Sequence, residues 1–112
     1  SKKHVASLGI VVGDDFQGLG LGEKLMEYMH SYAKENGIKK VWLATYSTNK
    51  KALNLYKKMG YEVEGVFMYD EIINGKWEHV ISMAYLLDPE FKDSKSVRSE
   101  IVKMLNDERH NI

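Results

Sequence analysis

The chain has 112 residues, which is enough for one domain built around a single hydrophobic core. Hydrophobic residues make up 44% of it and aromatic residues 11%, a composition typical of a globular protein and not of a disordered one. Acidic and basic residues balance at 16 each, so the net charge offers no attraction for nucleic acid or for an anionic membrane surface.

Cysteine and histidine restrict the chemistry further. No cysteine is present, which excludes disulfides, thiolate metal sites and a thiol nucleophile from this sequence. The four histidines are scattered and form no pair at metal-ligand spacing, so we expect no metal site. No apolar run approaches the roughly 18 residues of a membrane span, and we expect an intracellular protein, most simply a cytoplasmic one.

The first part of the chain predicts a strand followed by a helix. His4–Val12 is a β-rich run that ends at a turn-forming Gly-Asp-Asp sequence. A helix is predicted over Leu21–Lys34 and is ended by Asn36-Gly37. Its apolar residues recur at helical spacing, and they are Leu21, Leu25, Tyr28 or Met29, and Tyr32 or Ala33.

The middle of the chain repeats this order of strand and helix. Val41–Tyr46 is predicted to be a short buried strand, and Ser47, Thr48 and Asn49 are three candidate N-caps for the helix that follows. That helix ends at Gly60. Its apolar face carries Ala52, Leu55, Tyr56 and Met59.

Two further strands and a helix complete the chain. Tyr61–Tyr69 and Glu78–Leu86 flank Asn74-Gly75, a dipeptide that strongly favours a two-residue hairpin turn. Beyond Pro89, an amphipathic helix is predicted from the spacing of Val97, Ile101, Met104 and Leu105. We therefore predict an α/β fold with a mixed (α+β) sheet, in the order β-α-β-α-β-β, over residues 1–88, and a C-terminal helical extension over residues 89–112.

A glycine-rich loop joins the first strand to the first helix, over residues 16–22 (Phe-Gln-Gly-Leu-Gly-Leu-Gly). Gly18, Gly20 and Gly22 carry no Cβ, so their backbone N–H groups can approach a ligand closely. The N-terminus of the following helix favours an anion such as a phosphate group. The same glycines would also serve a tight strand-to-helix turn that binds nothing.

Three known phosphate loops compete for this pattern. A Walker A loop needs Lys-Ser/Thr after its last glycine, whereas Glu23-Lys24 follows here. A dinucleotide-binding loop has the spacing G-x-G-x-x-G, which these alternating glycines do not match. The third pattern, Gln/Arg-x-x-Gly-x-Gly/Ala, is met by Gln17, Gly20 and Gly22.

This third pattern resembles the pyrophosphate loop of the GNAT N-acetyltransferases, and a second motif supports the resemblance. The family's motif Asn-x-x-Ala-x-x-Leu-Tyr-x-x-x-Gly-Phe is similar to the pattern formed here by Asn49, Ala52, Leu55, Tyr56 and Gly60-Tyr61. The resemblance covers residues 6–86 and implies that the chain binds acetyl-coenzyme A. The contacts that it implies are Ile10, Val11, Val12, Gln17, Gly18, Leu19, Gly20, Leu21, Gly22, Glu23 and Asn49.

Tyr56 is the residue to which the resemblance gives a catalytic role. On the residues alone, Tyr56 lies on the apolar stripe of its helix and is a core residue with a satisfied hydroxyl. The resemblance implies that it protonates the departing coenzyme A thiolate, because a phenol of pKa about 10 can share its proton with a thiolate of pKa about 8.5. Asn49 is similarly an N-cap by position, and the resemblance adds a contact with the cofactor arm.

Two features of the family are missing from the sequence. Members generally begin with about three strands and two helices before the strand that His4–Val12 resembles, so we expect a fragment, a natural half-domain or a chain that a partner completes. The carboxylates that serve some members as a base would stand at Ala44, or at Ala6 and Ser7. His79 is a weak candidate base, and an α-amine acceptor of pKa about 8 would need none.

Three functions follow from these observations. The leading one is an N-acetyltransferase that moves acetyl from acetyl-coenzyme A to a primary amine, which could be a protein N-terminus, a lysine or a small molecule. The alternatives are a non-catalytic coenzyme A-binding module or regulatory subunit, and a structural dimerisation domain. We also expect a two-fold homodimer, because the first strand would expose unpaired backbone groups along its outer edge.

Overall fold

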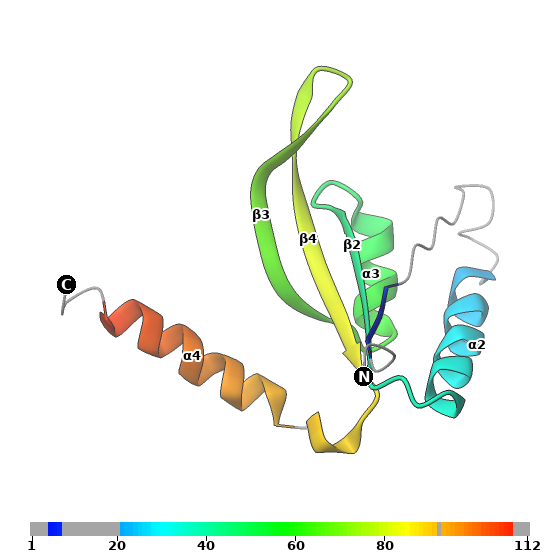
Figure 1. The fold of residues 1–112 in the computed structure, drawn as a ribbon. Coiled ribbons are helices and arrows are strands. Elements are labelled where there is room, and N and C mark those ends of the chain that lie inside the picture. Colours follow the sequence, from blue (N-terminus) through cyan, green and yellow to red (C-terminus); the bar gives the residue numbers. More distant parts are fainter. Residues whose placement is uncertain (1–4, 8–20, 92, 109–112) are drawn as a thin grey trace.

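The computed structural model describes residues 5–7, 21–91 and 93–108 of the chain (Figure 1). Its elements follow the predicted order of strand, helix, strand, helix, strand and strand, with a short 3-10 helix and a last helix after them. They are β1 (Val5–Ser7), α2 (Leu21–Glu35), β2 (Lys40–Tyr46), α3 (Lys50–Lys58), β3 (Glu62–Ile73), β4 (Lys76–Leu86), η2 (Pro89–Phe91) and α4 (Ser94–Glu108). The remainder of the predicted first strand, residues 8–12, lies outside the described residues.

The described strands form one mixed sheet in the order β1-β2-β4-β3. β1 pairs with β2 in parallel, while β4 pairs antiparallel with both β2 and β3. The parallel pair needs a crossover connection, which α2 supplies, and β3 is joined to β4 directly by a hairpin. The predicted fold class, an α/β fold with a mixed sheet, is confirmed.

The two faces of the sheet differ in how far helices cover them. Along β2, Val41 and Leu43 are buried, whereas the alternating residues Trp42 and Ala44 are exposed. This alternation has the two-residue period of a strand with one buried face. The core lies on the Val41 face, beneath α2 and α3, and its buried members are Met26, Ala33, Val41, Leu43, Ala52, Tyr56, Tyr61 and Met83.

The buried face of α2 agrees with only part of the predicted apolar stripe. Leu25 was expected on the stripe together with Tyr28 or Met29 and Tyr32 or Ala33. Leu25, Tyr28 and Tyr32 are exposed, whereas Met29 is half-buried and Ala33 is buried. The buried residues of α2 include Met26 and Ala33, seven positions apart and therefore on one face of the helix. The small Ala33 side chain brings the helix close to the sheet, and the flexible Met26 side chain fills the space beside it.

Both crossover helices end at a glycine in the left-handed conformation, as the sequence predicts. After α2, Gly37 has a φ of 73°, and the Ile38 N–H donates to the Ala33 carbonyl at 2.9 Å. After α3, Gly60 has a φ of 96°. A glycine in this conformation lets the chain reverse and satisfies carbonyls that the helix end leaves unpaired.

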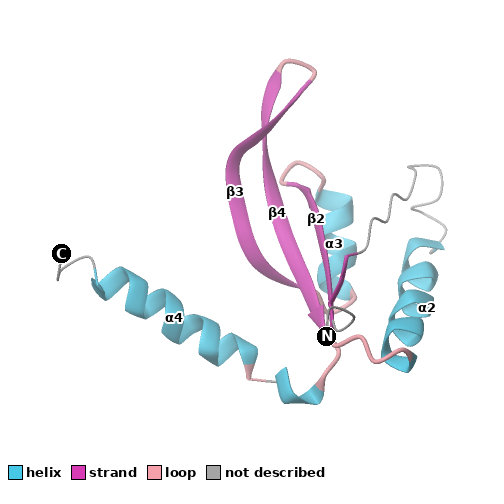
Figure 2. Cartoon of the chain, viewed as in Figure 1, coloured by secondary structure: helices cyan, strands magenta, loops and turns pink. Residues whose placement is uncertain are grey.

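The β3–β4 hairpin rises beyond the end of β2, and α4 extends from the opposite end of the sheet (Figures 1 and 2). The hairpin turn has positive φ values at both central residues, 53° at Asn74 and 75° at Gly75, which defines a type I′ turn. The indole of Trp77, on the projecting part of the hairpin, is 54% exposed. The predicted apolar stripe of α4, formed by Val97, Ile101, Met104 and Leu105, is 48% to 62% exposed.

Candidate active site

The predicted pyrophosphate loop leads into the first turn of α2. Leu21, Gly22 and Glu23 form this turn, so the helix begins where the loop pattern requires it to begin. The free N–H groups of a helix N-terminus can bind an anion at this position. The other predicted contacts lie outside the described residues, and they are Ile10, Val11, Val12, Gln17, Gly18, Leu19 and Gly20.

An ion pair joins the start of α2 to the end of α3. The Lys58 Nζ lies 3.1 Å from the Glu23 Oε2. An exposed pair of this kind contributes about 1 kcal/mol or less to the free energy of folding. Its importance here is that it shows which two helix ends lie side by side. It places the first turn of α2 beside the end of the helix that carries Tyr56. The Glu23 carboxylate is engaged by Lys58, which leaves its backbone N–H as the group for the predicted cofactor contact.

Asn49 caps the N-terminus of α3. Its side-chain Oδ1 accepts a hydrogen bond from the Ala52 N–H at 3.3 Å. This contact satisfies one of the N–H groups that the first turn leaves without a partner inside the helix. The predicted cap is therefore confirmed, and the contact of Asn49 with a cofactor arm stays a prediction.

Tyr56 lies on the buried side of α3 and is 7% exposed. Its ring packs at an angle against Tyr61, with ring centroids 5.9 Å apart. Burial raises the pKa of the Tyr56 phenol above its usual value, so the hydroxyl keeps its proton at neutral pH. None of the described residues hydrogen-bonds to that hydroxyl. A proton donor to a leaving group must be protonated before the reaction, so the protonated Tyr56 phenol is compatible with the predicted role.

Three side chains that the sequence motifs did not assign to the site lie in one cluster with Tyr56, and Tyr61 contacts it directly. These are His30 of α2, Tyr61 at the end of α3 and Tyr85 of β4, and their rings form one cluster. The spacing of α2 contains a signal for His30, because it lies four positions after Met26 and three before Ala33 on the buried face. Histidine scores as polar in a search for apolar residues, so a hydrophobic pattern alone passes over it.

His79, the weak candidate base, has a structural role in the hairpin. Its Nδ1 accepts a hydrogen bond from the Tyr69 N–H at 2.8 Å. Tyr69 has a φ of 52° and lies in an irregularity of β3 between Phe67 and Glu71. Such a left-handed conformation is strained for a tyrosine, and the hydrogen bond helps to hold it. With Nδ1 engaged as acceptor, the proton of the neutral ring lies on Nε2, so neither nitrogen is available as a base.

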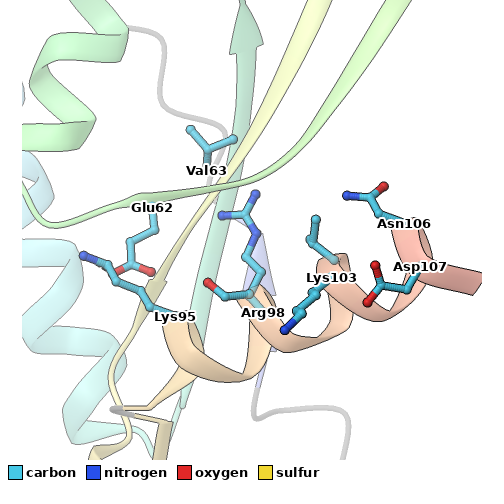
Figure 3. A pocket seen from close by; sticks show the side chains of 9 residues that line it. Glu62, Val63, Lys95, Arg98, Lys103, Asn106 and Asp107 are labelled. Carbon is cyan, nitrogen blue, oxygen red and sulfur yellow. Dashed lines mark ion pairs between the residues drawn. The ribbon is translucent and has the colours of Figure 1, made fainter.

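A groove of about 820 Å³ lies between β3 and α4, away from the predicted site (Figure 3). One end carries an ion pair in which the Lys95 Nζ lies 3.5 Å from the Glu62 Oε1. Its lining residues are Glu62, Val63, Lys95, Arg98, Ser99, Val102, Lys103, Asn106 and Asp107, and none of them belongs to the predicted site. The groove therefore adds no residue to the candidate active site.

The chain belongs to the acetyltransferase (GNAT) family, whose model matches residues 1–61 of the 112. The resemblance inferred from the two motifs is thereby confirmed. Among curated proteins, the chain is similar to spermidine N(1)-acetyltransferase of Escherichia coli K12, with 26% identity over 99 residues, which cover 88% of this chain and 53% of that protein. The chain thus spans about half the length of the curated relatives it matches.

Solved structures support the fold. An acetyltransferase of the GNAT family from Streptococcus pneumoniae is 32% identical and superimposes with a TM-score of 0.70, covering 74% of this chain and 51% of that one. A Salmonella typhimurium structure with its cofactor acetyl-coenzyme A is 23% identical, with a TM-score of 0.73, and covers 78% of this chain and 50% of that one. The predicted GNAT-like architecture is confirmed.

Within residues 5–7, 21–91 and 93–108, no group of three or more potential metal ligands gathers. No helix in the same part of the chain combines the length and the apolar character that crossing a bilayer requires.

Proposed function

We propose that the chain is the acetyl-coenzyme A-binding part of an N-acetyltransferase that acts on a primary amine. The observation that carries this proposal is the placement of Tyr56 relative to the first turn of α2. The Glu23–Lys58 ion pair sets that turn beside the end of α3, so a cofactor bound at the turn would lie next to the helix of the proton donor. Membership of the acetyltransferase family supports the same assignment.

The proposed reaction is a direct transfer. The amine nitrogen attacks the thioester carbonyl carbon, so that a C–N bond forms and the C–S bond then breaks. The coenzyme A thiolate takes the proton of the Tyr56 phenol, and the nitrogen releases one proton to solvent. The Tyr56 phenolate then regains a proton from solvent, which restores the phenol. The net products are the acetylated amine and free coenzyme A. Backbone N–H groups near the loop would stabilise the negative charge that develops on the carbonyl oxygen.

The acceptor is proposed to be an amine of the kind for which the relatives are named. These names include spermidine and amino acids. A panel of spermidine, free amino acids and a peptide with a free N-terminus therefore suits this chain. Release of free thiol with one of these amines would support the enzyme, whereas acetyl-coenzyme A binding with no thiol release would favour a non-catalytic binding module.

Binding of acetyl-coenzyme A is tested by calorimetry on the wild type and on Gly20→Val. We expect affinity to fall about 100-fold or more, because a side chain at Gly20 would block the close approach of the pyrophosphate to backbone N–H groups. Gly65→Val is the matched control, since a Cβ at Gly65 meets only the Phe67 ring, at 3.6 Å, and valine suits a strand. Equal affinities of a folded Gly20→Val variant and the wild type would remove the phosphate loop from the proposal.

We also propose that the chain forms a two-fold homodimer. Two features support this assembly, which are the apolar stripe of α4 and the position of β1 at one edge of the described sheet. Light scattering over a dilution series should give a dimer that persists at low micromolar concentration. Ile101→Lys should shift it toward monomer, whereas Ser96→Lys, on the same helix, should not. A wild type that is monomeric throughout the series contradicts the proposal.

A further inference from the structure

Four aromatic side chains from different parts of the chain form one cluster, and the candidate catalytic Tyr56 is one of them. His30 comes from α2, Tyr56 from α3, Tyr61 from the turn between α3 and β3, and Tyr85 from β4. Tyr61 is the centre of this group, because its ring contacts the rings of all three others at centroid distances of 5.4 to 5.9 Å. Tyr61 is 4% exposed, so its ring has little freedom to move.

The backbone ties Tyr61 directly to Tyr56. The Tyr61 N–H donates to the Tyr56 carbonyl at 2.9 Å, and the Gly60 N–H donates to the Lys57 carbonyl at 3.1 Å. These two bonds, with Gly60 in the left-handed conformation, form a Schellman motif, in which the side chains of the two outer residues pack together. The contact between the Tyr56 and Tyr61 rings is therefore built into the end of the helix.

A hydrogen bond from α2 fixes the other end of the Tyr61 ring. The Tyr61 hydroxyl lies 2.8 Å from the His30 Nε2. The His30 ring is itself held, because it stacks on Tyr85 with centroids 4.2 Å apart and an interplanar angle of 8°. Burial lowers the pKa of His30 and raises that of Tyr61, so both groups are neutral near pH 7 and the bond joins two uncharged partners.

We propose that Tyr61, anchored by His30, is a positioning residue that orients the Tyr56 phenol toward the coenzyme A sulfur. This inference rests on the proposed function. The Tyr56 hydroxyl has no hydrogen bond to a described residue, so the packing of its ring determines where its oxygen lies. A proton donor that is misplaced by about 1 Å loses much of its effect on the rate. The anchor lies on α2, so the helix that begins at the cofactor loop also sets the position of the donor.

The test compares three variants that each remove one group from the cluster. Tyr61→Phe keeps the ring and loses only the hydroxyl that binds His30, and His30→Leu loses the partner of that hydroxyl. Each should lower kcat about tenfold, with the dissociation constant of acetyl-coenzyme A unchanged within about twofold. The double variant should be no slower than either single one, because both changes break the same bond. Tyr85→Phe is the matched control, because it keeps the ring that stacks on His30 and removes a hydroxyl that bonds to no described residue, so kcat should stay within about twofold of the wild type.

A conservative variant separates positioning from packing. His30→Gln places an amide group near the position of Nε2, so it should recover most of the kcat that His30→Leu loses. No recovery, or equal losses in Tyr61→Phe and Tyr85→Phe, would overturn the inference.

A second readout applies if the wild type binds acetyl-coenzyme A but shows no turnover, which would refute the proposed function. With ¹³C-labelled tyrosine, the ring resonance of Tyr56 should shift or broaden in Tyr61→Phe and stay unchanged in Tyr85→Phe. An unchanged Tyr56 resonance in Tyr61→Phe would then refute the positioning role by itself.

Discussion

Replacing Tyr56 with phenylalanine should lower kcat about 100-fold or more, while the affinity for acetyl-coenzyme A stays within about twofold. The variant removes only a hydroxyl, and the ring still fills the same place against Tyr61. Without the phenol, the thiolate must leave without receiving a proton as charge builds on its sulfur. Steady-state kinetics and calorimetry on the same preparation give the two quantities separately.

The control for this experiment is Tyr32→Phe. Tyr32 is an exposed tyrosine of α2, so loss of its hydroxyl should change neither kcat nor affinity. Thermal unfolding of both variants should match that of the wild type. If Tyr56→Phe keeps full activity, Tyr56 is a packing residue only. Tyr61 would then have no catalytic group to position, and its proposed role would be refuted.

Replacing Gly60 with alanine should lower the free energy of unfolding by about 3 kcal/mol. Two effects add at this position. The φ of 96° is unfavourable for a residue with a Cβ, and that Cβ would lie 2.9 Å from the Tyr85 Cε1. Tyr85 stacks on His30 and is held in the aromatic cluster, so it cannot move away freely. Urea denaturation measures the loss directly.

Gly37→Ala is a closely matched control, because Gly37 ends α2 in the same way as Gly60 ends α3. Its φ is 73°, but a Cβ there has no neighbour within 4 Å. The expected loss is therefore about 1 kcal/mol, the cost of the left-handed conformation alone. The difference between the two variants measures the clash with Tyr85. Equal losses would mean that the Tyr85 ring makes room without cost.

Features that depend on a few neighbouring residues were predictable from the sequence. Asn49 as a cap, Gly37 and Gly60 as helix ends, and Asn74-Gly75 as a hairpin turn all follow from local backbone chemistry, and the structure has each of them. The face of α2 was predicted correctly only at Ala33, because two apolar patterns overlap on that helix. Leu25, Tyr28 and Tyr32 follow one, and Met26 and Ala33 follow the other, so only packing against the sheet decides between them.

The residues of the candidate site also differ in whether a local sequence pattern could identify them. Tyr56 and Asn49 belong to one short motif with fixed spacing along the chain, so a family resemblance could single them out. The bond between His30 and Tyr61 joins residues 31 positions apart, and no local pattern links them. Their meeting depends on the crossover of α2 and on the reversal of the chain at Gly60. Such a contact requires the tertiary structure.

The placement of the aromatic residues also decides which spectroscopic signal reports on the core. Both tryptophans of the chain lie on the surface, since Trp42 is 38% exposed and Trp77 54% exposed. Indole emission therefore senses the outer face of β2 and the projecting hairpin. The buried Tyr56 and Tyr61 rings are held in fixed contact, so the near-ultraviolet circular dichroism of tyrosine follows the packing between α2, α3 and the sheet. An unfolding curve recorded only by tryptophan fluorescence would miss a loosening confined to that region.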